Sequence, residues 1–293
     1  MEQKENLESI LPEHRKAVEG IRKKYGHTLS AHAFNSLYLW RREMELSLLL
    51  EEDMFTVKCG WKGKNCWFFP CGGREGVLEF LKRHETEETF SLCYMREQDR
   101  ELLESCFPGK YEIREAADSY EYLCEREGHM LLQGKTYANV RTQLHKIERE
   151  HRLSVQPLGR ENMKAALEIV GGWKGKGIYA LNPAGVDLEG LENREAMGIT
   201  GVLVYVDGEP CSIAAGYPIT NDTYDLYLSK EKLRIPGLSY YTKREFFFAL
   251  PEQYHYLNIE EDLGIEGLRL EKRKLGIAKM NRIWGLPVPE TGA

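Results

Sequence analysis

Three strand-like segments follow one another between residues 199 and 228, and this run constrains the fold of the C-terminal half. The segments cover residues 199–206, 210–218 and 223–228. Asp207-Gly208 stands between the first two, and this dipeptide is typical of the two-residue turns that join antiparallel strands. The run therefore predicts a hairpin followed by a further strand.

The N-terminal half alternates strand-like and helical patterns. Helices are expected at residues 12–25, 33–40, 75–83 and 97–106. Strands are expected at residues 45–50, 54–59, 65–70, 90–94 and 111–113, with hairpin-turn chemistry at residues 61–65. This order predicts a hairpin-rich sheet onto which the helices return.

A strand and a long helix connect the two halves. The strand is expected at residues 120–123, and the helix after it carries an apolar stripe at three- and four-residue spacing, made by Tyr137, Val140, Leu144 and Ile147. From residue 153 the order of elements starts again. Besides the run above, strands are expected at 154–158, 254–257 and 278–284, and helices at 160–170, 187–197, 239–250 and 265–275. A glycine-rich loop is expected at 171–177.

The predicted organisation is two tandem domains. The N-terminal domain covers residues 1–117, the connecting strand and helix cover 118–152, and the C-terminal domain covers 153–293. The predicted fold class is α/β (α+β), in which each domain is a mixed, mostly antiparallel sheet flanked by helices. Residue identity between the halves is negligible, so the repeat rests only on the order of the elements.

Composition and charge argue against several classes of protein. No apolar run approaches the roughly 20 residues of a membrane span, and the charged N-terminus lacks the apolar core of a signal peptide. A cytoplasmic location is therefore expected. The net charge of −6 argues against a general nucleic-acid coat. The seven cysteines include no C-x-x-C pair and no zinc-ligand spacing, so we expect buried thiols and no metal.

Three consecutive carboxylates, Glu260, Glu261 and Asp262, follow the apolar run at 254–257 and precede an amphipathic segment. One acid at a helix N-terminus complements the helix dipole, and capping is therefore the alternative interpretation. Capping needs a single acid, whereas three indicate a site. Glu260 and Glu261 are candidate catalytic residues, and the candidate substrate-binding residues around them are Asn258, Asp262 and Arg269.

The loop at residues 230–240 joins a strand to a helix and is rich in basic residues. Free N–H groups at a helix start, together with nearby cations, suit a pyrophosphate. The predicted cofactor-binding residues are Lys232, Arg234, Gly237, Leu238 and Ser239. An ordinary connection with solvated lysines is the alternative for this loop. Pro236 can donate no N–H to a pyrophosphate, and it supports a binding protein that keeps the fold without the chemistry.

Three further positions are candidates on weaker grounds. Lys135 and Arg141 belong to a basic patch around the connecting helix that suits a phosphate-bearing substrate or a tRNA end, although a solvated helix face with i,i+4 partners is favoured locally. Glu195 ends the acidic helix before residue 199 and is a candidate base if it faces a cleft. Tyr240, at the start of the next helix, is a candidate acid.

These pieces together resemble a known family. The blocks are Asp118-Ser-Tyr-Glu-Tyr-Leu123, Gly134-Lys-Thr-Tyr137 with Arg141, and Asn258-Ile-Glu-Glu-Asp-Leu-Gly-Ile-Glu-Gly-Leu-Arg269. They look like the signatures of the DUF2156 proteins, a family similar to the soluble C-terminal domain of phosphatidylglycerol lysyltransferases. The resemblance covers most of the chain from Ala33 onward. It implies two GCN5-related acetyltransferase (GNAT) folds in tandem.

Two departures from the family's pattern bear on the substrate. Family members usually carry a basic Lys-Arg-Asn-His run where this chain has Val140-Arg-Thr-Gln143, which weakens a phosphate or RNA role for that helix. Leu270-Glu-Lys-Arg-Lys274 replaces the expected Ala-Lys-x-Ser-Tyr continuation. A substrate pocket that differs from that of the lipid-modifying members is therefore expected.

The resemblance implies transfer of an acyl or aminoacyl group to an amine or hydroxyl acceptor. The donor is acyl-CoA or aminoacyl-tRNA, and the net acidity and the lost basic run favour the smaller donor over tRNA. The C-terminal half is expected to be active, with Glu260, Glu261 or Glu195 as base and Tyr240 as the acid for the leaving group. The N-terminal half is expected to be a degenerate copy. The alternative is a non-catalytic ligand-binding protein on the same scaffold.

Overall fold

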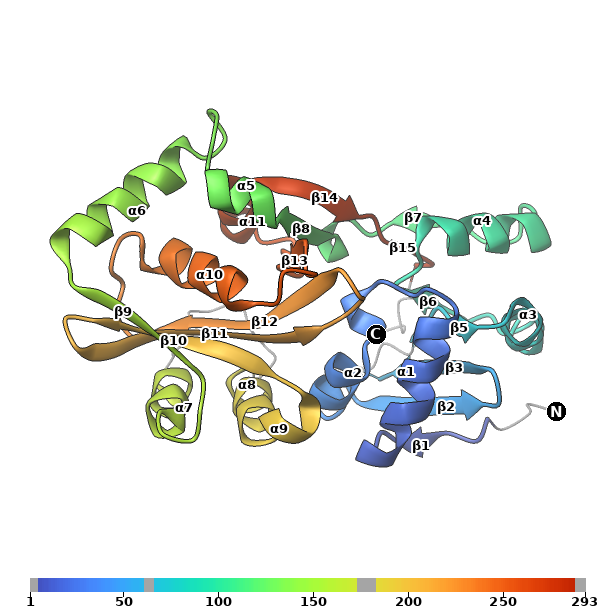
Figure 1. Cartoon of the computed structure of the whole chain (residues 1–293). Helices are drawn as coiled ribbons and strands as arrows, with labels where there is room; N and C mark the ends of the chain where they lie inside the picture. Colours follow the sequence, from blue (N-terminus) through green and yellow to red (C-terminus); the bar gives the residue numbers. More distant parts are fainter. Residues whose placement is uncertain (1–4, 61–65, 173–182, 288–293) are drawn as a thin grey trace, which may run out of the picture. The chain divides into compact units, whose positions relative to one another are not determined.

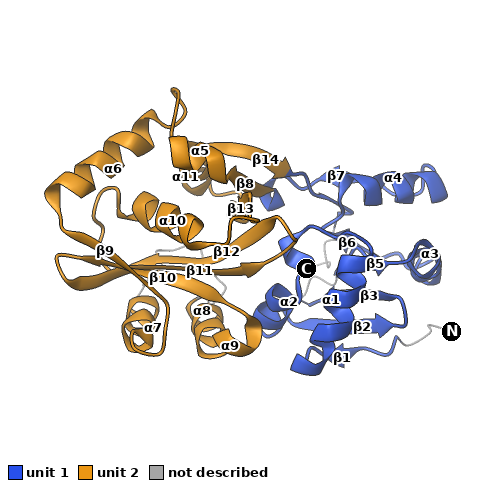
Figure 2. Cartoon of the chain, in the orientation of Figure 1, with its two compact units in different colours: residues 1–120, 281–293 blue, residues 121–280 orange. Residues whose placement is uncertain are grey.

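The computed structural model describes residues 5–60, 66–172 and 183–287 of the chain (Figure 1). The chain divides into two compact units (Figure 2). Unit 1 consists of residues 1–120 and 281–293, and unit 2 consists of residues 121–280. Each unit has its own sheet, so the two are described separately.

Unit 1 is built on a six-stranded sheet. Its strand order is β1-β2-β3-β4-β6, with β5 also pairing with β3. The pairings are antiparallel except that of β4 with β6, which is parallel. The strands are β1 (Glu8–Ser9), β2 (Leu46–Glu51), β3 (Met54–Cys59), β4 (Cys66–Phe68), β5 (Cys71–Gly72) and β6 (Leu92–Cys93). The helices are α1 (Arg15–Lys24), α2 (Phe34–Trp40), α3 (Arg74–Arg83) and α4 (Glu97–Cys106).

The unit 1 sheet separates two hydrophobic clusters because successive strand residues point to opposite faces. In β4, Cys66 and Phe68 belong to a cluster that includes residues of α1 and α2. Trp67 belongs to the second cluster, with residues of α3 and α4. Both faces of this short strand are therefore buried.

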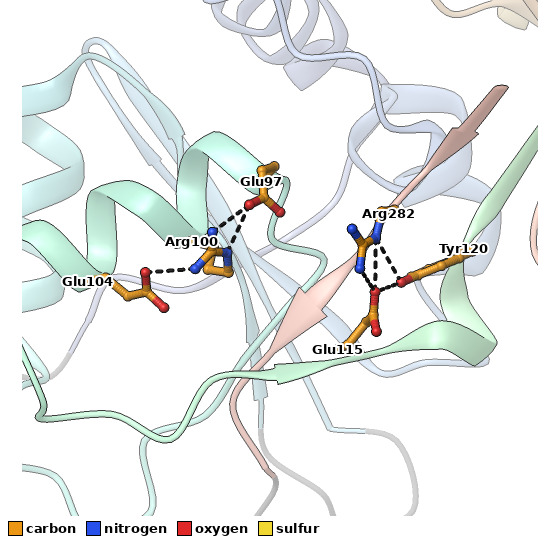
Figure 3. Close-up of polar contacts among 6 residues, drawn as sticks. All are labelled: Glu97, Arg100, Glu104, Glu115, Tyr120 and Arg282. Atoms are coloured by element: carbon orange, nitrogen blue, oxygen red, sulfur yellow. Dashed lines mark hydrogen bonds and ion pairs between the residues drawn. The ribbon is translucent and has the colours of Figure 1, made fainter.

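The C-terminal residues of the described chain complete unit 1. β15 (Trp284–Gly285) pairs with β7 (Arg114–Glu115), and Trp284 also bridges to Met95. Arg282 donates hydrogen bonds to Glu115 (2.9 Å) and Tyr120 (3.2 Å), as Figure 3 shows. Leu286 lies in the second hydrophobic cluster.

Unit 2 contains a seven-stranded sheet covered by helices on both faces. The strand order is β14-β8-β13-β12-β11-β10-β9. In Figure 1, α7, α8 and α9 lie on one side of the sheet, and α6 and α10 lie on the other. The strands are β8 (Glu121–Glu125), β9 (Leu153–Pro157), β10 (Thr200–Val206), β11 (Glu209–Pro218), β12 (Thr223–Glu231), β13 (Tyr256–Asn258) and β14 (Ile277–Asn281). The helices are α5 (Arg126–Leu131), α6 (Ala138–Glu150), α7 (Met163–Gly171), α8 (Pro183–Glu192), α9 (Arg194–Met197), α10 (Leu238–Ala249) and α11 (Glu266–Lys274).

The pairing between β12 and β13 ends early. The two strands run parallel, whereas β12 pairs antiparallel with β11 and β13 pairs antiparallel with β8. Only the first residues of β12, from Thr223 to Asp225, pair with β13. β12 then continues to Glu231 along β11, while β13 stops at Asn258. The sheet therefore divides beyond Asp225 and Asn258.

The structure confirms the predicted fold class of a mixed α/β protein whose sheets are flanked by helices. The strands predicted between 199 and 228 form β10, β11 and β12. Asp207 and Gly208 both have positive φ (54° and 94°), as their two-residue turn requires. The strand predicted at 111–113 is wrong, because the chain first pairs at Arg114–Glu115. The turn at 61–65 and most of the predicted glycine-rich loop lie outside the described residues.

The strand expected to connect the halves, β8, is an interior member of the unit 2 sheet, between β14 and β13. Within the described ranges, no helix is both long and apolar enough to cross a membrane.

Candidate functional site

Buried polar side chains gather where β12 and β13 separate. Asp225 on β12 and Asn258 on β13 are paired in register, and both are fully buried. Asn258 donates a hydrogen bond from Nδ2 to Glu121 Oε2 on β8 (3.1 Å). Its Oδ1 accepts a hydrogen bond from the backbone N–H of Glu260 (2.8 Å). Asn258 therefore ties two neighbouring strands to the residue that follows β13.

Glu260 is held in an unusual backbone conformation. Its φ of 58° lies in the left-handed region, which non-glycine residues seldom adopt. Lys272 of α11 is buried and donates hydrogen bonds to the backbone carbonyls of Ile259 and Glu260. The N–H of Tyr122 also donates to the Glu260 carbonyl (3.3 Å). Such conformations persist where the surroundings over-determine them, and they occur often at functional sites.

A helix brings a further carboxyl group to the same face. Tyr217 stands opposite Asp225 in the register of β11 and β12, and Tyr227 follows Asp225 by two residues, so all three share one face of the sheet. α8 packs against this face, because a Cβ added at Gly190 would lie 2.7 Å from the Tyr227 hydroxyl. Asp187, one turn earlier in α8, is buried, with Oδ2 3.2 Å from Nζ of Lys230. We call Asp187, Asp225 and Glu260 the carboxyl cluster.

Burial raises the pKa values of the carboxyl cluster. The pKa of Glu260 rises to about 8, because burial and the charge of Glu261 outweigh the opposing charge of Lys272. Burial, followed by the charges of Glu260 and Glu121, raises the pKa of Asp225 well above its usual value. Burial raises the pKa of Asp187 to about 6 against the effect of Lys230. Burial also lowers the pKa of Lys272, although Glu260 opposes this shift.

Part of this site lacks hydrogen-bond partners in the described chain. Tyr217 lies close enough to influence the pKa of Asp225. Neither carboxyl oxygen of Asp225, however, meets hydrogen-bond geometry with a described residue, and the buried Tyr227 hydroxyl meets none either. A buried polar group without a partner costs about 1–3 kcal/mol. The site is therefore suited to receive a polar group from a ligand.

The amino-acid sequence matches one protein family over most of its length. The family described as "Phosphatidylglycerol lysyltransferase, C-terminal" matches residues 22–275. The chain belongs to this family. No protein among those with curated descriptions matches it significantly.

Three solved structures show the same fold. A conserved protein of unknown function from Bacteroides thetaiotaomicron has a TM-score of 0.86 at 22% identity, covering 98% of this chain and 100% of that one. L-PGS from Bacillus licheniformis has a TM-score of 0.65 at 13% identity, covering 98% and 95%. The DUF2156 C-terminal domain of an Agrobacterium fabrum protein described as a lysylphosphatidylglycerol synthetase has a TM-score of 0.63 at 14% identity, covering 94% and 91%. The predicted resemblance is confirmed, and so is the predicted fold class of mixed sheets flanked by helices.

The acidic block of this family member divides between two environments. Glu260 joins the carboxyl cluster, and Glu261 beside it is partly buried. Asp262 turns toward α11 and accepts hydrogen bonds from Arg269 (2.7 and 2.9 Å), Tyr122 (2.5 Å) and the Gly264 N–H (2.9 Å). Burial raises the pKa of Asp262, but the bonds from Arg269 and Tyr122 more than offset this and leave the pKa below its usual value. None of the three acids is the N-cap of α11, which is Ile265.

Two other predicted catalytic residues have partners of their own. The Tyr240 hydroxyl donates to Glu271 Oε2 (2.8 Å), and burial followed by this bond raises the pKa of Tyr240. Glu195 lies exposed on α9 in an ion pair with Arg160 (3.3 Å), whose hydrogen bond lowers the pKa of Glu195.

The predicted cofactor-binding loop leads into α10. Lys232 and Arg234 are exposed. Gly237 has a φ of 91°, and a Cβ there would lie 2.4 Å from the Gln143 carbonyl oxygen, so this position requires glycine. Leu238 is buried, and its N–H is bonded to the Ile235 carbonyl (3.0 Å). Ser239 accepts a hydrogen bond from Lys243.

The two basic candidates near α6 have different surroundings. Arg141 donates hydrogen bonds to the carbonyls of Leu132 and Gly134, and so it holds the connection between α5 and α6. Lys135 is exposed on that connection.

Sequence reasoning missed Asp187, Asp225, Tyr227 and Lys272. Asp225 offered a signal, because aspartate is depleted in strands and seldom fully buried. It stands within the otherwise apolar sequence Thr223-Tyr-Asp-Leu-Tyr-Leu228. Among the described residues, no group of three His, Cys, Asp or Glu side chains is arranged to hold a metal ion.

Proposed function

We propose that the chain transfers an acyl or aminoacyl group to an amine or hydroxyl acceptor at the carboxyl cluster of unit 2. The observation that carries this proposal is Glu260, a partly buried carboxyl group with a pKa raised to about 8 where two parallel strands separate. A general base works best when its pKa lies near the operating pH. Membership of a family described by lysyl transfer supports the same class of reaction.

The transfer requires one base and one acid. Glu260 takes the proton from the acceptor N–H or O–H while the acceptor's lone pair attacks the carbonyl carbon of the donor ester or thioester. The tetrahedral intermediate then expels the donor's oxygen or sulfur, which takes up a proton. Tyr240, which the sequence predicted as the acid, is our candidate for this proton donor. Holding the two reactants together supplies much of the remaining rate enhancement.

The chemistry of the cluster favours a substrate that carries an amine. Asp225 and Tyr227 have acceptor oxygens without partners in the described chain. An ammonium group would supply both the hydrogen bonds and the positive charge that buried carboxylates need. An acetyl group offers neither. We therefore favour an aminoacyl donor, with a lysyl group as the first example because the family's description contains lysyl transfer.

The test is a transfer assay on the purified full chain. Lysyl-tRNA, a mixed aminoacyl-tRNA pool and acetyl-CoA, each labelled in the transferred group, are offered with phosphatidylglycerol vesicles or simple amines. The label should appear on an acceptor, and the rate should rise with pH through an apparent pKa of about 8. Glu260→Gln should lower the rate by about 10²–10⁴-fold, the usual contribution of a general base.

Glu209→Gln is the matched control, because Glu209 is an exposed carboxylate on a strand of the same sheet. Full activity in Glu260→Gln would contradict the proposed base. Saturable binding of a donor without transfer to any acceptor would favour the ligand-binding alternative.

A further inference from the structure

Three cysteines of unit 1 lie on one face of three neighbouring strands, where Cys93 is paired in register with Phe68 and is a diagonal neighbour of Cys66. Cys59 on β3 is paired in register with Cys66 on β4. Cys93 lies on β6, which pairs in parallel with β4. All three thiols share one face of the sheet, because Cys59 and Cys66 belong to the same hydrophobic cluster and Cys93 packs against it. The Sγ atoms of Cys66 and Cys93 are 3.4 Å apart.

The surroundings of these thiols set them apart from the other buried cysteine of the sheet. A disulfide bond is about 2.0 Å long, so the sulfur atoms of Cys66 and Cys93 must approach by about 1.4 Å. Cys93 is partly exposed, and a small oxidant can therefore reach it. Cys71 is buried, and burial raises the pKa of its thiol to about 12, which disfavours the reactive thiolate.

We propose that Cys66 and Cys93 are a site of reversible oxidation at which a peroxide forms a disulfide between β4 and β6. The Cys93 thiolate attacks one peroxide oxygen, the O–O bond breaks, and the leaving oxygen departs as water after protonation. The Cys66 thiol then attacks the sulfenic sulfur of Cys93 and a second water leaves. Two thiols and one hydrogen peroxide thus give one disulfide and two waters, with both sulfurs oxidised and the peroxide reduced.

The bond would constrain a weak part of unit 1. β6 consists of only two residues. Two backbone hydrogen bonds join its segment to that of β4: the Trp67 N–H donates to the Ser91 carbonyl and the Phe69 N–H donates to the Cys93 carbonyl, each at 2.9 Å. The disulfide would close a loop that contains α3. Closing such a loop restricts the unfolded chain and stabilises the folded one. Oxidation is therefore expected to raise the melting temperature of unit 1 by several degrees.

The proposal does not depend on transfer chemistry, and its test uses none. The reduced full chain is treated with hydrogen peroxide, its remaining thiols are blocked with iodoacetamide, and its peptides are analysed by mass spectrometry. A peptide pair joined through Cys66 and Cys93 should appear and should disappear with dithiothreitol. Melting curves of the treated and untreated protein give the second measurement.

Variants make the assignment specific. Cys93→Ser and Cys66→Ser should each abolish the cross-link and the rise in melting temperature, whereas Cys71→Ser and Cys124→Ser should retain both. Since Cys93 is partly exposed, Cys93→Ser keeps the test informative even if Cys66→Ser does not fold. Alkylation of both thiols after peroxide treatment, sulfinic acid at Cys93 without a cross-link, or a bond between Cys59 and Cys66 would each overturn the proposal.

Discussion

Unit 1 contains a buried pair of histidines, and unit 2 contains a buried cluster of carboxyl groups. Unit 1 buries His27 and His32, whose ring centroids are 3.9 Å apart, whereas unit 2 buries carboxyl groups. The physical cause of the pKa shift is the same in both, because burial disfavours the charged form. Burial lowers the pKa of His27, and it lowers that of His32 to about 3, while it raises those of Asp225 and Glu260. The same cause therefore gives the histidine pair and the carboxyl cluster opposite responses to pH.

The neighbours of these groups differ as well. The charges of Arg22 and Arg96 oppose protonation of His27. Arg22 is itself engaged by Glu19 (2.8 Å) and by the His27 carbonyl (2.8 Å). In unit 2 the carboxyl groups raise one another's pKa values, so a cation would stabilise them. This contrast supports unit 2 as the unit that receives a charged substrate, and a structural role for the histidine pair.

The largest expected difference concerns transfer. Asp225→Asn should lower kcat/KM for an amine-bearing donor by about 10- to 100-fold, because a hydrogen bond to a charged group contributes about 1.5–3 kcal/mol. His27→Leu in unit 1 should leave kcat/KM unchanged. The measurement is steady-state transfer from lysyl-tRNA by equal amounts of folded protein. Equal losses in both variants would remove the functional contrast between the units.

The second prediction concerns acid. A folded-state pKa below the unfolded value of 6.5 means that the stabilising contribution is complete above pH 6.5 and is lost as the pH falls toward the folded pKa. His27→Leu should therefore reduce the acid sensitivity of unit 1, by up to about 1.4 kcal/mol per pH unit. Urea unfolding over a series of acidic pH values measures this slope. An unchanged slope would mean that the pKa of His27 is the same in the folded and the unfolded protein.

The third prediction is the alkaline counterpart in unit 2. Glu260 has a folded pKa of about 8 against a usual 4.5, so its contribution is complete below pH 4.5 and is lost as the pH rises to 8. Glu260→Gln should flatten this dependence by about 1 kcal/mol per pH unit or less, because partial exposure reduces the effect. Urea unfolding between pH 4.5 and about pH 8, the usual and the raised pKa of Glu260, is the measurement. A steeper dependence in Glu260→Gln would contradict the raised pKa.

The smallest effect is expected at the surface of unit 1. Figure 3 shows Arg100 between Glu97 and Glu104, with donor–acceptor distances of 3.1 and 2.7 Å. Exposed pairs of this kind contribute little to stability. Glu104→Gln should leave the melting temperature unchanged at moderate salt. A clear fall in melting temperature would contradict this, and it would show that surface ion pairs contribute to the stability of unit 1.

Local patterns predicted the elements well, and long-range pairings lay beyond them. α4 spans Glu97–Cys106, the same residues that periodicity indicated. The sheet position of β8 could not be predicted, because its partner β13 follows more than 130 residues later. The point at which β12 and β13 separate depends on how the two strands pair, and it cannot be predicted from the sequence of either strand alone.

The residues of the site also fall into those that the local sequence indicated and those that only the tertiary structure revealed. Glu260 attracted notice because three acids in a row are conspicuous in a sequence. Asp225 did not, because the depletion of aspartate from strands is a weak signal when only one residue carries it. Lys272 belongs to a basic run that is typical of a solvated helix face, yet its side chain is buried. Burial of a polar side chain depends on tertiary packing, and composition carries little information about it.

The return of the chain from unit 2 to unit 1 has a consequence for synthesis on the ribosome. Residues 281–287, which pair with β7 and place Leu286 in a unit 1 cluster, are translated only after the whole of unit 2. Unit 1 therefore cannot be completed while unit 2 is being translated, and the residues that Trp284 and Leu286 contact stay uncovered during that time. We expect unit 2 to become protease-resistant first on stalled ribosomes, an inversion of the usual N-terminal-first order.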